Sequence, residues 1–403
     1  MDITAEQLRP RRLDPLGAGQ HAENEQLRAA GPAALVELPG GVVVWAIARH
    51  DTLQELLADP RVAKSAEHWS LFREGRLPEG WPLMTFITVP GMTTSDGTDH
   101  RRLRGLVSQA LTPRRIAALA PAIEQLVAEL LDGVAAADGA VDLRSAFAYP
   151  LPMHVIGTFL GLSKDEQDRL HELSNTVVSS SATPGAGAAA ARELNALLAG
   201  VVAAKRAEPA DDLTTALIAA REEQDRLSEA ELIGTLLQLV VAGHETTLNL
   251  ICNAVRALLT HPEQLRLVLD GEVGWSAVVE ETLRWDSPVG QFPMRYATED
   301  IRLGDLVIRA GEAMLASYAA AGRDADHYPE ADRFDLTREA RHLSLGHGPH
   351  FCIGSALARL EAETALRELF ARFPGLRLAE GEEPKPIASF VSNSISSLRV
   401  HTS

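Results

Sequence analysis

The stretch SLGHGPHFCIG, residues 344–354, places one cysteine among three glycines and two histidines. Glycine has no side chain and tolerates positive φ, so such a stretch can fold tightly and bring its backbone against a flat ligand. A helical pattern follows, and we expect Cys352 to open that helix, because the N–H groups at a helix N-terminus favour the thiolate. The stretch therefore predicts a tight loop built around a cysteine with a chemical role.

Residue type alone leaves other roles open for this cysteine. A lone cysteine is most often a small buried side chain. Zinc and iron–sulfur sites need several ligands, and the only other cysteine, Cys252, lies in a distant segment. A Cys–His nucleophile is the enzymatic alternative, because His350 is two residues from Cys352. That alternative leaves the three glycines unexplained.

The stretch resembles the haem-ligand loop of cytochrome P450, whose pattern is Phe-Gly-x-Gly-x-His-x-Cys-x-Gly. Leu345 stands in place of the phenylalanine, and every other fixed position matches. The resemblance implies haem b, iron protoporphyrin IX, as cofactor, with Cys352 as the thiolate ligand of the iron and His350 beside the haem. It also implies a mainly α fold in one cytochrome P450 domain, residues 1–403. In that fold a large helical part and a small β-rich side enclose haem between a long central helix and the cysteine loop.

Composition limits the cellular compartment and the classes of partner that we expect. The chain of 403 residues is 46% hydrophobic and 23% charged, which is ordinary for a soluble globular protein. A net charge of −17 argues against a nucleic-acid partner. The N-terminus lacks the apolar core of a signal peptide, and no apolar run approaches a membrane span of about 20 residues. Two widely spaced cysteines fit a reducing compartment. We therefore expect a cytoplasmic protein, similar to the soluble bacterial type of P450, with no membrane anchor.

A second pattern predicts a helix long enough to cross the molecule. Ser228 and Glu231 form a capping box, and helical periodicity continues to Leu259, which gives about 32 residues and about 48 Å. Midway, the stretch VAGHETT, residues 241–247, combines glycine with threonine hydroxyls that can bond backbone carbonyls, so the helix is weakened there.

This midpoint matches the family pattern Ala-Gly-x-(Glu/Asp)-Thr. The resemblance implies that it lies over the open face of the haem, where Ala242 and Gly243 leave room for O₂. Glu245 and Thr246 would then be the catalytic acid–alcohol pair that delivers protons during O₂ activation. A helix kink would explain the glycine and threonines but not the carboxylate. Gln238, one turn earlier, could present its amide to substrate or bond within the protein.

Several basic residues are candidates for binding haem propionates. His100 and Arg104 are four residues apart, so they share one face of a predicted helix. They match the family's His-x-x-x-Arg pair, which holds a propionate, and Arg295 matches its second propionate-binding arginine. Other arginines nearby could instead form a basic patch for an acidic, ferredoxin-type electron donor. These are Arg101, Arg102, Arg114 and Arg115.

Two irregular stretches supply the candidate substrate pocket. Residues 69–95 are rich in glycine and proline, yet they hold Trp69, Phe72, Trp81 and Phe86. Large side chains on an irregular segment suit a pocket wall, although they could equally anchor the loop to the core. Broad apolar area with one isolated amide suits a bulky, mostly apolar ligand, such as a steroid, terpenoid or macrolide. The candidate substrate-binding residues are Trp81, Met84, Phe86, Gln238, Ala242, Val289 and Phe292.

Other segments are predicted to form the scaffold. Residues 34–38 and 42–47, joined by Pro-Gly-Gly, read as a β-hairpin. Glu281 and Arg284 are three residues apart. This spacing alone does not indicate a function, because surface pairs of opposite charge are common. In the family this pair is buried with a further arginine, matched here by Arg333.

The low-complexity segment 179–191 is predicted to be a linker. Residues 388–399 are predicted to form strand–turn–strand, with 390–395 as the last pocket segment.

Together these features imply a haem-thiolate monooxygenase, an oxidoreductase that inserts one oxygen atom of O₂ into an apolar substrate. Electrons would come from a separate ferredoxin and ferredoxin reductase. A haem-dependent peroxygenase and a haem carrier or sensor are the alternatives that keep the haem. The Cys–His hydrolase is the alternative without it.

Overall fold

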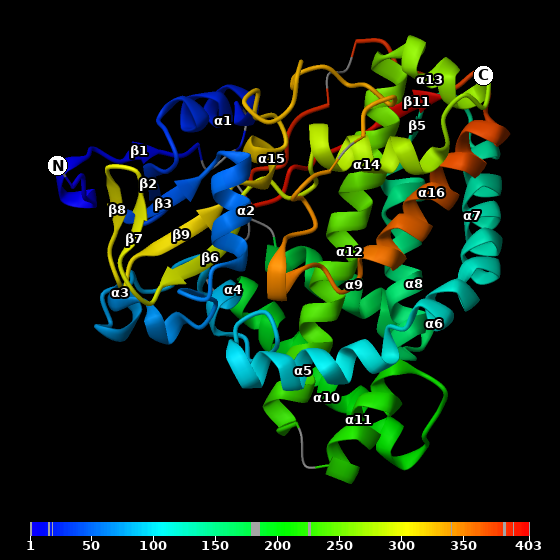
Figure 1. The fold of residues 1–403 in the computed structure, drawn as a ribbon. Coiled ribbons are helices and arrows are strands. Elements are labelled where there is room, and N and C mark those ends of the chain that lie inside the picture. The colour runs from blue at the N-terminus through cyan, green and yellow to red at the C-terminus, as the bar shows by residue number, and fades with distance from the viewer. Residues whose placement is uncertain are drawn as a thin grey trace.

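The computed structural model describes residues 2–14, 17, 19–178, 186–224, 227–339, 341–381, 384–389 and 391–402. A β-rich region lies on one side of a much larger helical body, and α12 runs through the middle of that body (Figure 1). This is the mainly α architecture with a small β-rich side that the sequence predicts. Among the described residues, no helix is both long and apolar enough to cross a bilayer.

The helices, in chain order, are α1 (Gln20–Ala29), α2 (His50–Ala58), α3 (Ser70–Arg73), α4 (Met84–Thr88), α5 (Gly97–Ala110), α6 (Pro113–Ala118), α7 (Ala120–Ala135), α8 (Pro150–Leu160), α9 (Lys164–Val178), α10 (Ala186–Ala207), α11 (Leu213–Gln224), α12 (Glu229–Thr260), α13 (Pro262–Leu269), α14 (Trp275–Trp285), α15 (Tyr318–Ala321) and α16 (Ser355–Arg372). Short helical turns are η1 (Ala5–Gln7), η2 (Ala66–His68), the π-helical η3 (Arg144–Ala148) and η4 (Gly348–His350).

The strands are β1 (Arg11–Arg12), β2 (Ala34–Leu38), β3 (Val42–Ile47), β4 (Val62–Ala63), β5 (Val141–Asp142), β6 (Phe292–Ala297), β7 (Ile301–Leu303), β8 (Leu306–Ile308), β9 (Ala313–Ala316), β10 (Arg377–Leu378) and β11 (Arg399–His401). A mixed sheet has the order β1-β2-β3-β9-β6-β4, and smaller sheets have the orders β10-β11-β5 and β7-β8.

In the main sheet, β6 lies between β9 and the short edge strand β4. The antiparallel β2–β3 pair confirms the predicted hairpin, and Gly40 and Gly41 make its turn with φ values of +82° and +74°. Strand β9 runs parallel to β3 and antiparallel to β6. The register of β6 shifts between Phe292 and Arg295, the two residues of this strand that the sequence assigns to the site.

Helix α12 has the predicted start and length. The Ser228 hydroxyl accepts from the N–H of Glu231 at 3.2 Å, and the Glu231 carboxylate accepts from the N–H of Ser228 at 2.7 Å. The capping box thus satisfies backbone donors that a helix start leaves without intrahelical partners. The helix then runs for 32 residues. It brings the residues of its midpoint to the centre of the molecule (Figure 1).

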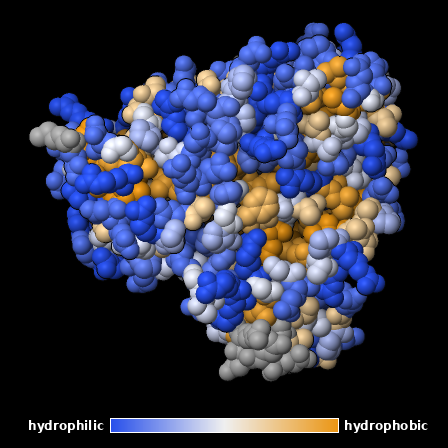
Figure 2. Space-filling model, viewed as in Figure 1, coloured by the Kyte–Doolittle hydropathy of each residue, from blue (hydrophilic) through white to orange (hydrophobic). Residues whose placement is uncertain are grey.

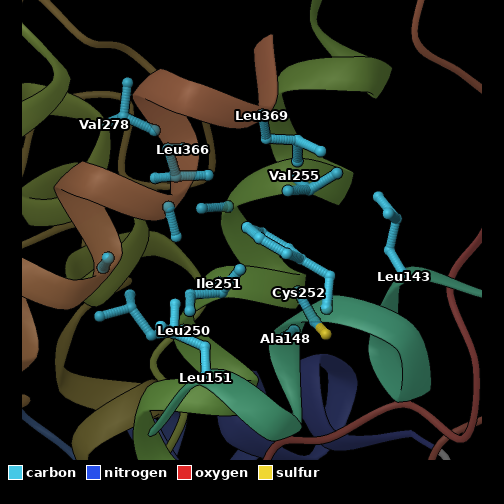
Figure 3. Close-up of a cluster of buried hydrophobic side chains, with 14 of the residues drawn as sticks. Leu143, Ala148, Leu151, Leu250, Ile251, Cys252, Val255, Val278, Leu366 and Leu369 are labelled. Atoms are coloured by element: carbon cyan, nitrogen blue, oxygen red, sulfur yellow. The ribbon is translucent and has the colours of Figure 1, made fainter. Parts of the chain in front are cut away.

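A large cluster of buried apolar side chains surrounds the second half of α12 (Figure 3). There Val255 lies beside Leu369 of α16, whereas Cys252 lies beside Ala148 of η3. Cys252 is 1% exposed, and burial raises the pKa of its thiol to about 12. This second cysteine is therefore a core residue with an unreactive thiol.

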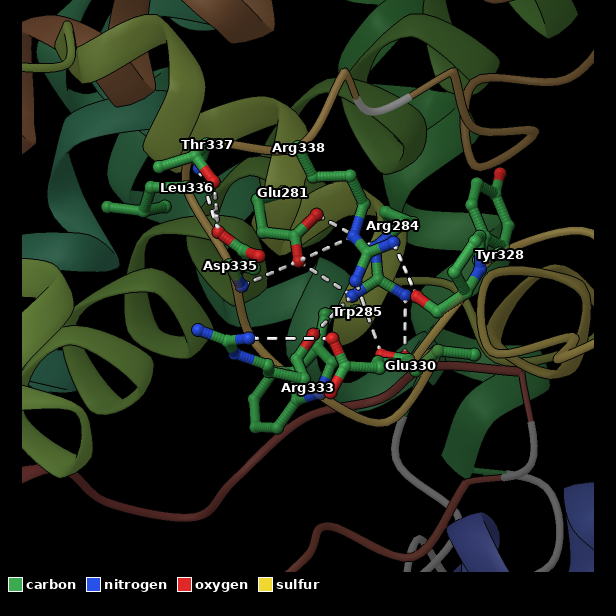
Figure 4. Close-up of polar contacts among 12 residues, drawn as sticks. Glu281, Arg284, Trp285, Tyr328, Glu330, Arg333, Asp335, Leu336, Thr337 and Arg338 are labelled. Atoms are coloured by element: carbon green, nitrogen blue, oxygen red, sulfur yellow. Dashed lines mark hydrogen bonds and ion pairs between the residues drawn. The ribbon is translucent and has the colours of Figure 1, made fainter.

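A buried ion pair holds α14 to the loop that follows α15 (Figure 4). The Arg284 guanidinium donates to both Glu281 carboxylate oxygens, at 2.6 and 2.7 Å, and to the carbonyls of Gly322 and Ala331. The two side chains are 0% and 1% exposed. Because these contacts of the guanidinium are all short, the buried charge is well compensated.

The structure corrects the third member of this cluster. The Arg333 side chain is 55% exposed and lies 3.5 Å from Glu330, so it is not buried beside Glu281. Its backbone carbonyl accepts from Arg284 at 2.8 Å instead. The arginine that approaches Glu281, at 3.7 Å, is Arg338, whose side chain is 13% exposed.

Two segments differ from their predicted form. Residues 186–191 of the predicted linker begin α10, because alanine favours helix, whereas 179–185 lie outside the described residues. The predicted strand–turn–strand at 388–399 is mostly irregular, with isolated bridges Val289–Ser392 and Pro386–Ile395, and β11 begins only at Arg399. Phe390 lies outside the described residues.

The buried pair predicts unequal costs for two arginine substitutions. Arg284→Met removes the bidentate partner of the buried Glu281 carboxylate, so it should lower the free energy of unfolding by about 3–5 kcal/mol. Arg333→Met removes only an exposed side chain and should change it by less than about 0.5 kcal/mol. Urea denaturation followed by far-UV circular dichroism measures both. Equal losses of unfolding free energy in the two variants would contradict the exposed position of the Arg333 side chain.

Candidate active site

The cysteine loop is a tight turn closed on itself. The Cys352 N–H donates to the Leu345 carbonyl at 2.7 Å, and Gly346 and Gly348 have φ values of +77° and +69°. Cys352 does not open α16 as predicted, because that helix begins at Ser355. The loop therefore presents the thiol just before the helix.

Gly348 allows a close approach between this loop and the end of α2. A Cβ atom at Gly348 would lie 2.7 Å from the Leu57 carbonyl oxygen and 3.2 Å from the Ala58 Cα. Both neighbours are backbone atoms, so a side chain could be accommodated only by moving the loop. The packing against α2 thus fixes where the thiol lies.

Opposing effects act on the Cys352 thiol. Burial raises its pKa, whereas the Gly354 N–H and the charges of Arg104 and Arg359 act in the other direction. A cationic setting with a backbone donor stabilises a thiolate, and a bound metal ion would deprotonate the thiol outright. The loop is therefore suited to supply one sulfur ligand.

A cavity of about 260 Å³ separates this loop from the midpoint of α12. Most of the residues that the sequence assigns to the site line this cavity. They are His100, Arg104, Gln238, Ala242, Thr246, Val289, Phe292, Arg295, His350 and Cys352. Met92, Thr93, Ile156 and Phe159, which the sequence analysis missed, also line it. Hydrophobic residues gather in a hollow near the centre of one face, between the main body and the lobe of α10 and α11 (Figure 2).

Three predicted pocket residues lie outside this cavity. Trp81 is 3% exposed, its indole N–H donates to the Pro39 carbonyl at 3.0 Å, and its ring lies 5.7 Å from that of Trp69. Met84 and Phe86 pack against the same apolar cluster. These aromatic residues anchor an irregular segment to the β-rich side, which was the alternative open from the sequence.

The Gln238 amide nitrogen is bonded within the protein, whereas the amide oxygen is buried without a partner among the described residues. Its Nε2 donates to the Val89 carbonyl at 3.2 Å. A Cβ atom at Gly91 would lie 2.5 Å from the amide oxygen, so the amide packs flat against that glycine. Gln238 therefore holds residues 89–91 against α12 while part of its side chain lines the cavity.

The two candidate catalytic residues point in different directions. Thr246 lines the cavity, and its hydroxyl donates to the Ala242 carbonyl at 2.6 Å. Glu245 is absent from the cavity wall; it bonds Ser392, and burial raises the pKa of its carboxyl. Adjacent helical residues point about 100° apart, which explains why only one of them faces the cavity.

Basic side chains cluster on another part of the wall. The rings of His100 and His350 lie 4.0 Å apart, and His350 lies 3.9 Å from Asp96. Burial, with His350 and Arg104 nearby, lowers the pKa of His100 to about 4. Within the described residues, His100 Nε2 and Arg295 Nη1 are buried and have no hydrogen-bond partner. Such donors indicate a site for an anion that faces the cavity.

Sequence reasoning also missed a buried lysine in this wall. Lys64 is 5% exposed, lines the cavity and donates from Nζ to the Met294 carbonyl at 2.7 Å. A lysine directly after the apolar residues of β4 was the available signal, because lysine is seldom fully buried unless paired.

Part of the candidate basic patch for an electron donor is already neutralised. Arg102 donates to Glu231 at 2.6 Å, and Arg115 lies 3.6 Å from Asp211. Arg101 and Arg114 are exposed.

Comparison with known proteins identifies relatives over nearly the whole chain. The family model for cytochrome P450 matches residues 275–399. The chain is 40% identical to 2-hydroxy-5-methyl-1-naphthoate 7-hydroxylase of Streptomyces carzinostaticus, with 97% of each protein covered. It is 41% identical to vitamin D(3) 25-hydroxylase of Pseudonocardia autotrophica, covering 90% of this chain and 88% of that one. The solved structure of CYP154C4 from Streptomyces sp. W2061 matches with a TM-score of 0.94, 45% identity and 98% of each chain covered.

The site described above fits haem b, the cofactor of this family. Cys352 would supply the thiolate ligand to the iron. The donors of His100 and Arg295 that have no partner among the described residues would meet the propionates, together with Arg104 and His350. The glycine loop would let the backbone approach the flat ring.

Packing at Gly348 predicts that haem retention depends on this glycine. Gly348→Ala should lose haem, because its Cβ atom meets the Leu57 carbonyl and displaces the loop. Gly304→Ala is the matched control, since Gly304 has φ +65° and no atom within 4 Å of its added Cβ. Both should lose about 1–2 kcal/mol from positive φ. Haem content from the pyridine haemochrome, with thermal unfolding, separates the two effects. Full haem content in Gly348→Ala would contradict this account.

Proposed function

The chain belongs to the cytochrome P450 family, and from that premise we propose which residues carry out its reaction and what class of substrate it oxidises. It is a haem-thiolate monooxygenase, an oxidoreductase that uses O₂, a substrate and a redox partner. The observation that carries the proposal is the cavity with Cys352 on one wall and Thr246 on the facing helix. When bound, the haem supplies the O₂ activation that inserts one oxygen atom into substrate.

Thr246 is the proposed proton donor inside the cavity. Its hydroxyl now bonds the Ala242 carbonyl, and rotation about one side-chain bond would release it for a reacting group. Ala242 and Gly243, also on the wall, keep this turn free of bulky side chains.

Glu245 is the proposed source that replaces the proton. Burial raises the pKa of its carboxyl, so a larger fraction holds a proton near neutral pH than in an exposed glutamate. Ser392 bonds this carboxyl, and the Arg144 charge acts on it. The acid therefore lies off the cavity and behind Thr246, as an internal proton reservoir requires.

The proposed substrates are bulky and mostly apolar, of the steroid, terpenoid or macrolide class. Large apolar side chains line much of the cavity, among them Ile156, Phe159, Val289 and Phe292. Each CH₂ buried against such a wall contributes about 0.8 kcal/mol. The relative named vitamin D(3) 25-hydroxylase fits this choice.

The proposed electron donor is a ferredoxin-type protein. An acidic donor would be repelled by a net charge of −17, so docking requires a local basic surface. Arg101 and Arg114 remain exposed for this role. The proposed compartment is the cytoplasm, where a free Cys352 stays reduced for ligation.

Removal of the Thr246 hydroxyl should separate electron consumption from product formation. Thr246→Ala should retain haem and substrate affinity, yet divert NADH consumption to hydrogen peroxide, with product falling by about 10²–10⁴-fold. Added peroxide should restore some product. Thr260→Ala is the matched control, because Thr260 makes the same bond to the carbonyl four residues back, away from the cavity. Coupled turnover at the wild-type rate in Thr246→Ala would reject the proton-donor role.

Glu245→Gln should instead slow coupled turnover, because it removes the acid that resupplies the proton but leaves the Thr246 hydroxyl in place. We expect a larger solvent isotope effect than in the wild-type enzyme. Steady-state rates in H₂O and D₂O measure this effect. An unchanged rate would place the proton source elsewhere.

The substrate class can be tested by binding alone. A panel of steroids, terpenoids, macrolides and small charged compounds is titrated into the haem-loaded protein, and the Soret shift gives each dissociation constant. Tightest binding is expected among the bulky apolar compounds. Preference for small charged compounds would overturn the proposed class.

A further inference from the structure

Two histidines and an aspartate meet at the start of α2. His50 and Asp51 are the first two residues of that helix, whereas His327 belongs to the loop after α15. Asp51 Oδ1 lies 2.9 Å from His50 Nδ1 and 2.8 Å from His327 Nδ1. The two imidazole rings stack with their centres 3.4 Å apart. None of the three residues lines the cavity, so this cluster is separate from the candidate active site.

The spacing of these side chains suits the coordination shell of a divalent metal ion. One ligand atom from each residue, an imidazole nitrogen or a carboxylate oxygen, lies within 4.8 Å of the other two. Ligands of tetrahedral zinc, with bonds of about 2.0–2.2 Å, lie roughly 3.3 Å apart. The contacts of 2.8 and 2.9 Å are shorter than that separation by about 0.5 Å, which small side-chain rotations would supply.

Charge distinguishes a cation site from a pair of ordinary hydrogen bonds. The printed partners of the Asp51 carboxylate are both imidazoles, and no lysine or arginine pairs with it in the described part of the chain. The nearby Arg49 guanidinium lies instead against two other carboxylates, those of Asp324 and Asp326. Asp51 therefore keeps a negative charge beside two nitrogen donors, and this combination favours a cation.

Burial of the cluster is uneven. The His50 side chain is 4% exposed, and its Nε2 is buried without a hydrogen-bond partner among the described residues. Such an unsatisfied buried nitrogen indicates that an ion or a water completes the surroundings of the ring. The side chains of His327 and Asp51 are 31% and 75% exposed. The cluster thus has one side within the protein and one side that a solvated ion can reach.

We propose that His50, Asp51 and His327 bind a divalent transition-metal ion such as Zn²⁺, through one nitrogen of each imidazole and the Asp51 carboxylate. Two nitrogen donors with one oxygen donor suit zinc, whereas Mg²⁺ and Ca²⁺ prefer sites made of oxygen alone. Water would complete the coordination on the exposed side. This site does not depend on the proposed function, because it lies outside the cavity.

A metal ion at this cluster would tie α2 to the loop after α15. His50 and Asp51 stand at one end of α2, and the backbone of Leu57 near its other end packs against Gly348 of the cysteine loop. An ion that binds the folded protein alone stabilises it by an amount that grows with the free ion concentration. The proposed ion would therefore stabilise the helix that supports the cysteine loop.

Zinc binding by the tag-free, haem-loaded protein tests the site. Equilibrium dialysis against ZnCl₂, with metal analysis by mass spectrometry, should give one Zn²⁺ per wild-type chain, and equimolar MgCl₂ should not displace it. His327→Phe keeps a stacked ring but removes its nitrogens, so it should weaken zinc binding by at least about 10–100-fold. His68→Ala removes an exposed histidine elsewhere and is the matched control, which should bind zinc as the wild type does.

Two further measurements separate coordination from folding. Zinc X-ray absorption of the loaded wild-type protein should show two histidine ligands. Added ZnCl₂ should raise the unfolding temperature of the wild-type protein and leave that of His327→Phe unchanged. Asp51→Asn, which keeps the size of the side chain but removes its charge, replaces His327→Phe if that variant does not fold.

Absence of stoichiometric zinc from the wild-type protein would overturn the site, and so would equal zinc affinity in the wild type and the ligand-removing variant. Hydrogen bonds would then account for the cluster. The reduced CO spectrum of the same samples tests the proposed monooxygenase independently of that result.

Discussion

The close contact between Gly348 and the Leu57 carbonyl is the constraint on which the site depends. It leaves no room for a side chain, so the cysteine loop can press against the end of α2. The bond from the Cys352 N–H to Leu345 then closes the loop and fixes the sulfur. A metal ligand must be held to within about half an ångström, and rigid packing of its neighbours provides that precision. The loop depends on backbone contacts that few other residues would permit.

The facing wall, formed by α12, leaves open space where the cysteine loop is closely packed. Helix α12 is continuous for 32 residues, but its midpoint combines Gly243 with a threonine hydroxyl that bonds the helix backbone. Small residues create space there, and the 100° step between neighbours sends the Glu245 carboxyl away from that space. One turn of helix can therefore present a hydroxyl to the cavity and keep an acid behind it.

Buried charges serve two purposes in this molecule. Arg284 and Glu281 satisfy each other and bind backbone carbonyls, so they stabilise the scaffold. The basic side chains of the cavity differ, because His100 Nε2 and Arg295 Nη1 are buried without partners among the described residues. A scaffold pair is complete by itself, whereas a binding site keeps donors for its ligand. Because His100 and Arg295 also line the cavity, the contrast is consistent with an anion bound there.

Sequence patterns predicted the site better than its surroundings. The ends of α12 follow from local spacing, and the structure reproduces them. Cys352 and Thr246 were assigned by family resemblance, and both line the cavity. Trp81 was misplaced because the partner of its indole, Pro39, is distant in sequence and no local pattern shows which face of an irregular segment is buried. Arg338 replaces Arg333 near Glu281 for a similar reason, since both lie on one loop and only tertiary packing decides which turns inward.

The central claim is that Cys352 supplies a thiolate to haem iron, and the spectrum of the reduced, CO-treated protein tests it most directly. Only thiolate ligation gives the strongly red-shifted Soret band. The wild-type protein and Cys252→Ala should both show that band, because Cys252 lies in the core away from the cavity. Cys352→His should lose it even where haem is retained. A band that survives in Cys352→His, or that is absent from the wild-type protein, would contradict the account.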